Sequence, residues 1–316
     1  NSAIQIDKNF YDCYWNRGLL LLLLGRFKEG WEDYEFRFKK KSPTDARHLN
    51  EPRWEGCSLE GKRILVIAEQ GFGDCIQFVR YLDLIKRNGG HIILECKKEL
   101  KRLFECLASV DEFIEKGEKD ITTLNYDYYV HLMSLPYLFK TTLNNIIDNT
   151  PYIKAKAELV QKFKSEMNRE GFKVGIVWGG NPKQDKNDSR SIPCEKFKVL
   201  KNISGIELYS LQKGDARKEA DDGIIDLSEK INDFADTAAI IENLDLVITV
   251  DTSVAHLAGA MGKETWVLLS SIPDWRWMLN RKDSPWYKSI RLFRQSKQGD
   301  WDSVFEEIIR ELRKLI

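Results

Sequence analysis

The stretch that most constrains the fold of this chain runs over residues 244–269. An apolar run at 246–250 is followed by apolar side chains at helical spacing over 254–261. Gly262 then supplies a common helix stop, and a second apolar run occupies 265–269. A buried strand, a helix and another buried strand in this order predict a βαβ crossover in a parallel sheet. We therefore expect an α/β fold.

Four polar residues stand where the first of these strands ends: Asp251, Thr252, Ser253 and His256. Open α/β sheets bind ligands at the carboxyl ends of their strands, so we expect these side chains to gather at a ligand site. The backbone N–H groups of this turn suit a diphosphate, and Asp251 can accept a hydrogen bond from a sugar or ribose hydroxyl. The alternative is that the aspartate, threonine and serine act only as helix caps.

Strands alternate with helices in two blocks of similar length, which predicts two Rossmann-like domains. The cleft between two such domains is the default ligand site. We expect a helical hairpin at 1–42, the two domains at 43–170 and 171–298, and a C-terminal helix at 299–316. The other strands are predicted at 63–68, 91–96, 112–114, 126–132, 173–178, 206–211, 222–227 and 290–293, and the main helices at 75–87, 100–107, 158–169, 195–201 and 233–243.

The first 42 residues resemble one tetratricopeptide unit. Two short helices joined at Gly25 are predicted, and one such unit cannot bury both of its faces. It therefore either caps a longer array or packs on the next domain, and an unrelated helical hairpin is the alternative. The residues at the small and large positions of the 34-residue pattern are Gly18, Leu21, Phe27, Gly30 and Tyr34.

Charge and composition exclude several classes of partner. The 49 basic and 49 acidic side chains balance, so no overall field draws the protein to nucleic acid or to an anionic membrane. The longest wholly apolar run, 19–24, is far too short for a membrane span, and no signal peptide is visible. Six scattered cysteines and four scattered histidines indicate reduced thiols in a cytoplasmic protein and no metal site. The chain begins with Asn1 and not with methionine, which leaves open whether it is a fragment of a longer repeat protein.

Residues 71–74, Gly-Phe-Gly-Asp, follow a predicted strand and open a helix, as a dinucleotide-binding motif does. Ile76 replaces the third glycine of that motif, and Asp74 puts a negative charge where the pyrophosphate would lie, so we disfavour NAD and flavin. A carboxylate at a helix N-terminus stays ionised and can accept a proton from an attacking hydroxyl. The alternative is a helix cap that fixes the loop.

A polar, glycine-containing loop follows the strand predicted at 173–178. Glycines let the backbone approach a ligand, and a guanidinium can hold two phosphate oxygens, so Arg190 is the preferred phosphate partner. Lys183 and Lys186 in the same loop can equally be solvated surface residues. Gln212 and Lys213 end the next strand on the same side of the sheet. Aromatic residues at 275–277 and 286–287 can stack on a sugar or pack against protein.

These motifs together resemble bacterial tetratricopeptide-repeat proteins that end in a glycosyltransferase domain. That domain is similar to the ADP-heptose lipopolysaccharide heptosyltransferases, which belong to glycosyltransferase family 9. The resemblance extends over nearly the whole chain. Its main motifs are WEG at Trp54, AEQGFGDCIQFVRYL from Ala68, VGIVWGGNP from Val174, DSRSIP from Asp188, SLQKG from Ser210, DLVITVDTSVAHLAGAMG from Asp245 and PDWRW from Pro273.

The resemblance implies a GT-B fold, with two Rossmann-like domains that face a cleft. It implies inverting sugar transfer from a nucleotide-sugar donor, without a required metal or other cofactor, to a protein or glycan acceptor. By motif, Asp74 matches the catalytic base of the N-terminal, acceptor domain. Asp251, Thr252, Ser253 and His256 match the donor-binding segment of the C-terminal domain, and Arg190 falls near a residue that holds donor phosphate.

The remaining residues expected at the site follow from the same motifs. The further donor-side residues are Gly179, Asn181, Gln212 and Lys213, and the residues of the acceptor side or its loop are Glu69, Gln70, Gly71, Gly73 and Gln77.

Two alternative functions stay open. One is a non-catalytic protein that binds a nucleotide sugar or acts as a scaffold, and the other is an isomerase of nucleotide sugars.

Overall fold

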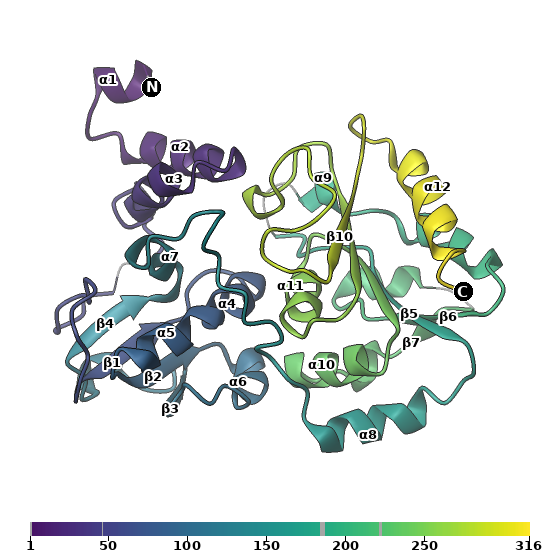
Figure 1. The fold of residues 1–316 in the computed structure, drawn as a ribbon, viewed down its shortest axis with the longest axis horizontal. Coiled ribbons are helices and arrows are strands. Elements are labelled where there is room, and N and C mark those ends of the chain that lie inside the picture. Colours follow the sequence, from purple (N-terminus) through teal and green to yellow (C-terminus); the bar gives the residue numbers. More distant parts are fainter. Residues whose placement is uncertain (1, 46, 184–186, 221–222) are drawn as a thin grey trace. The chain divides into compact units, whose positions relative to one another are not determined.

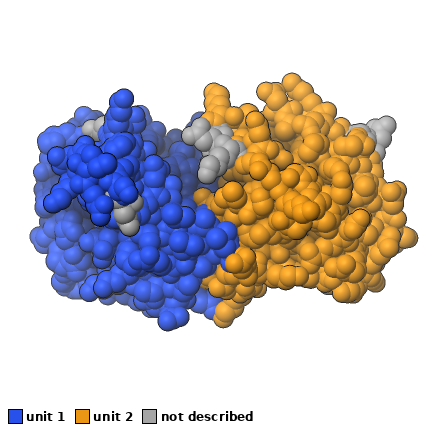
Figure 2. Space-filling view, turned by 90° about the horizontal axis from the view of Figure 1, so that it is seen from above, with its two compact units in different colours: residues 1–149, 275–279 blue, residues 150–274, 280–316 orange. Residues whose placement is uncertain are grey.

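The computed structural model describes residues 2–45, 47–183, 187–220 and 223–316. The chain forms two compact units, coloured separately in Figure 2. Unit 1 contains Asn1–Asn149 and the short segment Trp275–Leu279, and unit 2 contains Thr150–Asp274 and Asn280–Ile316. The segment Trp275–Leu279, which we call the strap, thus belongs to unit 1 although its neighbours in sequence belong to unit 2. The domain limits expected at 42/43, 170/171 and 298/299 stay predictions.

Unit 1 is built around a parallel four-stranded sheet in the order β3-β2-β1-β4 (Figure 1). The chain order reverses direction between β1 and β4, so this sheet has its switch point there. The strands are β1 (Arg63–Ile67), β2 (His91–Cys96), β3 (Glu112–Glu115) and β4 (Tyr128–His131).

The single helix predicted at 75–87 is wrong in its start and in its continuity. The segment consists of α4 (Phe72–Phe78), a 3-10 turn η2 (Val79–Tyr81) and α5 (Leu82–Arg87). The helix starts early because the Asp74 carboxylate accepts the Gly71 N–H at 2.8 Å and closes the first turn. It is interrupted where the buried Arg80 side chain donates to the Gln77 carbonyl at 2.9 Å, which competes with the helical ladder.

A helical hairpin precedes the sheet in unit 1, as predicted. It is formed by α2 (Tyr11–Leu23) and α3 (Phe27–Tyr34), and its close packing explains the two small residues. A Cβ atom at Gly18 would lie 2.9 Å from the Tyr34 nitrogen, and one at Gly30 would lie 2.8 Å from the Leu22 side chain. Membership of the tetratricopeptide class stays a prediction. The other elements of unit 1 are α1 (Ser2–Ile6), η1 (Glu35–Phe38), α6 (Lys98–Phe104), η3 (Ile121–Thr123), η4 (Leu132–Ser134), α7 (Leu135–Leu138) and η8 (Trp275–Trp277).

Unit 2 is built around a six-stranded sheet in the order β10-β9-β8-β5-β6-β7, in which every described strand pairing is parallel. The strand order reverses direction between β5 and β8, which is the switch point of this sheet. The strands are β5 (Phe172–Val177), β6 (Ile206–Ser210), β7 (Ile225–Asp226), β8 (Leu246–Val250), β9 (Thr265–Leu269) and β10 (Ile290–Arg294).

The predicted βαβ crossover is confirmed, with α11 (Ser253–Ala260) between β8 and β9. Alternate residues of the strands, such as Ile176, Ile248 and Leu268, form one buried core with the helices on their face of the sheet. In Figure 1 the C-terminal helix lies on one side of this sheet, and α8 and α10 lie on the other. The helices and turns of unit 2 are α8 (Ala157–Glu166), α9 (Asn187–Arg190), η5 (Cys194–Asn202), η6 (Asp215–Glu219), η7 (Ser228–Lys230), α10 (Phe234–Glu242) and α12 (Trp301–Leu312).

Two other predicted elements of unit 2 differ from the structure. The helix expected at 195–201 is the 3-10 helix η5, and the strand expected at 222–227 is reduced to the two residues of β7 at the sheet edge. Residue 222 lies outside the described residues. In the ranges that the structure describes, no helix is long and apolar enough to cross a membrane. All six cysteines are described, and each is a free thiol.

Candidate functional site

In unit 2, a cation and a helix N-terminus meet at the switch point of the six-stranded sheet. Arg190, at the end of α9, donates from Nη1 to the Asp251 carbonyl oxygen at 3.1 Å, directly after β8. A Cβ atom at residue 180 would lie 2.3 Å from Arg190 Nη2, so Gly180 is the residue that lets the guanidinium lie against the backbone. The structure therefore brings together Arg190 and the Asp251 turn.

The side chain at the N-cap position of α11 makes no capping bond within the described part of the chain. Thr252 is the N-cap residue and has an extended backbone, with φ −138° and ψ 173°. Among the described residues, the helix receives no capping bond from this side chain, whose hydroxyl lies 3.1 Å from that of Thr249. Helix capping alone therefore does not explain why a threonine occupies position 252. Such a helix start presents N–H groups to an anion. Ser253 is the first helical residue, and it lies at the same end.

Gln212 and Lys213, at the end of β6, shape the same loops through their own hydrogen bonds. The Gln212 amide oxygen accepts the Gly179 N–H at 2.9 Å, and its nitrogen donates to the Gly179 carbonyl at 3.1 Å. Lys213 Nζ donates to the carbonyls of Ser228 and Ile231, at 2.7 and 2.9 Å. The ammonium group of Lys213 is thus engaged by backbone carbonyls, which makes it a support of the loop in this structure.

The remaining donor-side residues lie in the same unit. Asn181 accepts the Lys183 N–H at 3.0 Å and forms a tight turn, whereas Lys186 lies outside the described residues. His256 is buried in α11, and its Nδ1 lies 3.1 Å from the Tyr287 hydroxyl. Because Tyr287 is itself buried, it packs against protein and presents no face for a sugar to stack on.

In unit 1, the loop between β1 and α4 carries the candidate base. Asp74 lies in the first turn of α4, one residue after Gly73, and its side chain is 20% exposed. One carboxylate oxygen, Oδ2, accepts the Gly71 N–H at 2.8 Å, and the other, Oδ1, accepts from the Arg276 guanidinium of the strap. The loop before it is strained, because Gln70 has a positive φ of 69°.

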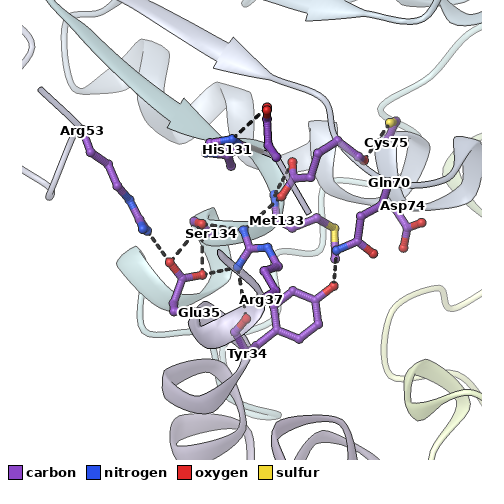
Figure 3. Close-up of polar contacts among 12 residues, drawn as sticks. Tyr34, Glu35, Arg37, Arg53, Gln70, Asp74, Cys75, His131, Met133 and Ser134 are labelled. Atoms are coloured by element: carbon purple, nitrogen blue, oxygen red, sulfur yellow. Dashed lines mark hydrogen bonds and ion pairs between the residues drawn. The ribbon is translucent and has the colours of Figure 1, made fainter. Parts of the chain in front are cut away.

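The helical hairpin supports this loop through a buried polar network, shown in Figure 3. Tyr34 accepts from the Gln70 amide at 2.7 Å, and the Arg37 guanidinium lies 2.9 Å from the Glu69 carboxylate. Arg37 also donates to the Ser134 hydroxyl at 2.7 Å, and Ser134 in turn donates to Glu35. Glu69 is only 2% exposed, so in this structure it anchors the loop to the hairpin.

Charged neighbours in this network shift the pKa values of Arg37 and Glu35. Burial by itself lowers the pKa of Arg37, but the Glu35 and Glu69 carboxylates outweigh it and hold that pKa above its usual value. Burial raises the pKa of Glu35, and the guanidinium groups of Arg37 and Arg53 more than reverse this effect. Arg37 and Glu35 therefore stay charged, as a paired buried cluster must.

The carboxyl end of β2 does not offer a free acid for a ribose. Glu95 is 1% exposed, and both of its oxygens accept from Arg47, at 2.7 and 2.9 Å. Arg47 also bonds to Asp45, which lies 3.3 Å from His131 at the end of β4. The connector before β1 thus covers the end of β2, and Arg47 occupies both oxygens of Glu95.

Sequence reasoning missed Arg276 as a residue of this site. Its Nε donates to the buried Gln77 side chain at 2.8 Å, and its guanidinium carbon lies 4.2 Å from the centre of the Trp275 ring. The pair with Asp74 joins residues 202 positions apart, so no local pattern reveals it. The only signal was the motif PDWRW, which places an arginine between tryptophans.

Metal ligands are not gathered anywhere in the described ranges. No group of three or more histidine, cysteine, aspartate or glutamate side chains there could hold a metal ion. The candidate site is thus made of carboxylate, guanidinium, amide and backbone groups.

Two Rossmann-like units with parallel sheets, preceded by a helical hairpin, define a GT-B fold. Solved glycosyltransferases share it. A glycosyl transferase family 9 protein from Veillonella parvula DSM 2008 superimposes with a TM-score of 0.57 and 16% identity, over 83% of this chain and 92% of that one. The E. coli ADP-heptose lps heptosyltransferase II superimposes with a TM-score of 0.58 and 14% identity, over 80% of this chain and 99% of that one. At these identities the likeness concerns the fold.

Two further comparisons complete this picture. The E. coli heptosyltransferase WaaC with ADP gives a TM-score of 0.52 and 12% identity, over 79% of this chain and 99% of that one. In sequence, the chain is 26% identical to Protein FlbA from Caulobacter vibrioides over 331 aligned positions. The match includes 94% of this chain but only 54% of that protein, so the chain spans about half the length of this relative. No family model matches the sequence.

Proposed function

We propose that this chain is an inverting glycosyltransferase that moves a sugar from a nucleotide-sugar donor to an acceptor hydroxyl. The observation that carries this proposal is the contact between Arg190 and the Asp251 turn, at the switch point of the six-stranded sheet. A guanidinium beside a helix N-terminus offers a positive charge and N–H donors to two phosphate groups. The fold, shared with heptosyltransferases, supports a nucleotide sugar as the ligand.

In the proposed reaction, Asp74 accepts the proton of the acceptor hydroxyl as its oxygen attacks the anomeric carbon. The bond between that carbon and the donor's phosphate oxygen breaks, and the nucleoside diphosphate leaves with the bonding electrons. Arg190 and the N–H groups at the start of α11 stabilise the charge that develops on the leaving group. Gly179, Asn181, Ser253 and His256 complete the donor side, and Gln70 and Gly73 line the acceptor side.

The donor, acceptor and compartment follow as finer proposals. One of the solved structures of this fold contains ADP, which supports an ADP-linked sugar such as ADP-heptose as donor. We propose that the helical hairpin is a tetratricopeptide unit and that the acceptor is a protein or a glycan. Six free thiols support a reducing, cytoplasmic environment.

A donor-binding experiment tests whether Arg190 and the Asp251 turn bind the nucleotide sugar. We expect one nucleotide sugar of a panel of ADP-, UDP-, GDP- and dTDP-sugars to raise the thermal midpoint, since a ligand at 100 times its Kd adds about 2.7 kcal/mol. By calorimetry, Arg190→Met should weaken binding about 10- to 100-fold, as the loss of a charge-assisted contact does. Arg310→Met, on an exposed arginine of α12, is the matched control. Equal affinities in all three proteins would argue against the proposed site.

One observation favours a second candidate, a protein that binds a nucleotide sugar without turning it over. Both oxygens of the Asp74 carboxylate already accept hydrogen bonds, from Gly71 and Arg276. A carboxylate oxygen has two lone pairs, so each can still accept a proton or a further hydrogen bond, and the catalytic role remains the better supported. Release of nucleoside diphosphate from the bound donor separates the two candidates.

A further inference from the structure

We propose that Arg276 is a positioning residue, which holds the Asp74 carboxylate in the orientation needed to accept the proton of the acceptor. This inference deepens the proposed transferase function and rests on it. The arginine is carried by the strap, Trp275–Leu279, which belongs to unit 1. Neither the helix that bears Asp74 nor the motif around it contains this residue.

The contacts of Asp74 fix its carboxylate at both oxygens. Oδ2 accepts the Gly71 N–H at 2.8 Å, and Oδ1 accepts from the Arg276 guanidinium. A carboxylate held in this way cannot rotate about its terminal torsion, so its remaining lone pairs have fixed directions. Because the Asp74 side chain is 20% exposed, a hydroxyl can approach these lone pairs. A general base must be oriented in this way before the substrate arrives.

The guanidinium that makes this contact is itself held by further contacts. Its Nε donates at 2.8 Å to Gln77, a side chain that is fully buried in α4. Its carbon lies 4.2 Å from the Trp275 ring centre and 5.9 Å from that of Phe78. The Arg276 side chain is 8% exposed. Gln77 and Asp74 are three residues apart on the same helix, so one guanidinium holds two side chains of one face.

The helical hairpin holds the strap in place. Trp275 packs edge-on against Trp31 of α3, with ring centres 5.3 Å apart, and also against Tyr34. Trp31 is anchored by a hydrogen bond from its indole nitrogen to the Thr141 carbonyl at 3.1 Å. The hairpin therefore supports the candidate base from two sides, through the strap and through the loop that contains Gln70. This arrangement gives the hairpin a role in the site that does not depend on an acceptor.

A purely structural ion pair predicts different results from a positioning residue. If Arg276 only stabilised unit 1, its replacement would lower the thermal midpoint and leave the turnover of the folded protein unchanged. If it orients Asp74, its loss lowers kcat and leaves the KM for the donor unchanged, because the contact is made to the base and not to the donor. A lysine, which keeps the charge, should restore part of the rate.

The experiment measures release of nucleoside diphosphate, with water as acceptor, from the nucleotide sugar that most raises the thermal midpoint. We expect Arg276→Met to lower kcat about 100-fold, as misplacement of a reacting group by about 1 Å does, with the KM for the donor within about twofold. Arg276→Lys should recover about tenfold of this loss. Arg281→Met is the control, because Arg281 holds Asp283 in an exposed arginine–aspartate pair of unit 2.

A double variant tests whether Arg276 acts through Asp74. In the Asp74→Asn background, Arg276→Met should change kcat by less than about threefold, since the base that it orients is already lost. An active wild-type protein whose Arg276→Met variant keeps its kcat would overturn the inference and leave the transferase proposal standing. So would a loss of activity that is the same in both backgrounds.

If the protein turns over no donor, the thermal midpoints of the same proteins still test whether Arg276 is coupled to Asp74. A wild-type protein that binds but does not turn over any donor of the panel refutes the proposed reaction. In that case, a midpoint loss in the double variant that is smaller than the sum of the two single losses supports the coupling of Arg276 to Asp74. Additive losses overturn it.

Discussion

Arg37 is a fully buried charge whose partners come from three parts of unit 1. It contacts Glu35 of η1 at the end of the hairpin, Glu69 of the loop after β1 and Ser134 after β4. The guanidinium also lies 4.1 Å from the centre of the Phe38 ring. One residue thus ties the hairpin to both strands that border the switch point of the four-stranded sheet.

Replacing Arg37 by Met should lower the free energy of unfolding by about 3–5 kcal/mol, because it leaves the Glu69 carboxylate buried without its cation. Urea unfolding measures this loss. Arg26→Met is the control in the same hairpin, since Arg26 is 60% exposed and its pair with Glu29 is solvated. A loss of stability below about 1 kcal/mol for the Arg37 variant would contradict the role of the network.

The Asp45 cluster gives a prediction about pH. Burial raises the pKa of Asp45, but hydrogen bonds from His131 and Arg47 outweigh burial and hold the pKa well below its usual 3.8. Because the folded state favours the carboxylate, this group stabilises the protein above pH 3.8 and loses that effect as the pH falls further. Asp45→Asn should therefore be less stable than the wild type at pH 7, and the difference should shrink below about pH 4.

The measurement for Asp45 is a series of urea unfolding curves of both proteins between about pH 7 and pH 2.5. Asp120→Asn is the comparison, because Asp120 is exposed and only Thr122 bonds lower its pKa, so its stability difference should be smaller than that of Asp45→Asn. A stability difference that stays constant down to the lowest pH would contradict the assignment of the stabilisation to the ionised Asp45 carboxylate.

At the scale of elements, the sequence predicted most where hydrophobic periodicity decides the structure. The switch from a continuous apolar run to helical spacing located β8, α11 and β9, because buried strands and amphipathic helices differ in their repeat. Hydrophobic periodicity did not predict the break in the helix at η2, where the Arg80 side chain donates a hydrogen bond to the Gln77 carbonyl. Periodicity contains no information about such a bond.

The loop after β5 offers a matched pair of glycine substitutions. A Cβ atom at Gly180 would lie 2.3 Å from Arg190 Nη2, whereas one at Gly179 would have its nearest neighbour, the Ala216 Cβ, at 3.4 Å. Gly180→Ala should therefore displace the flexible guanidinium from Asp251 and weaken donor binding about tenfold, with little loss of stability. Gly179→Ala should weaken donor binding less than Gly180→Ala, because its Cβ atom would not displace the Arg190 guanidinium. Calorimetry with the donor measures both affinities, and equal affinities would contradict the role given to Gly180.

At the scale of the whole molecule, the part that could not be predicted is the membership of the strap in unit 1. Local patterns predicted the two Rossmann-like blocks, because each strand and helix is encoded by neighbouring residues. The strap enters unit 1 through contacts between positions far apart in the chain, such as Trp31 with Trp275 and Asp74 with Arg276. Pairings at such separation leave no periodic trace, so the candidate base was predicted and the arginine beside it was not.

The proposed reaction depends on Asp74 acting as the base that accepts the proton of the acceptor hydroxyl. Donor binding alone does not test this claim, since a non-catalytic protein of the same fold would bind as well. The test must compare turnover with binding in the same pair of proteins. Asp283→Asn is the matched control, because Asp283 also pairs with an arginine and lies on an exposed loop.

The most direct measurement is the rate at which ADP is released from ADP-heptose by the wild type and by Asp74→Asn, alongside the affinity of each for ADP. We expect the wild type to release ADP and the Asp74→Asn protein to be slower by about 100- to 10,000-fold, the usual contribution of a general base. The affinities for ADP should agree within about twofold, because in the proposed reaction Asp74 contacts the acceptor and not the diphosphate. Equal rates of release in the two proteins, or no release by the wild type from this or any other donor of the panel, would contradict the account.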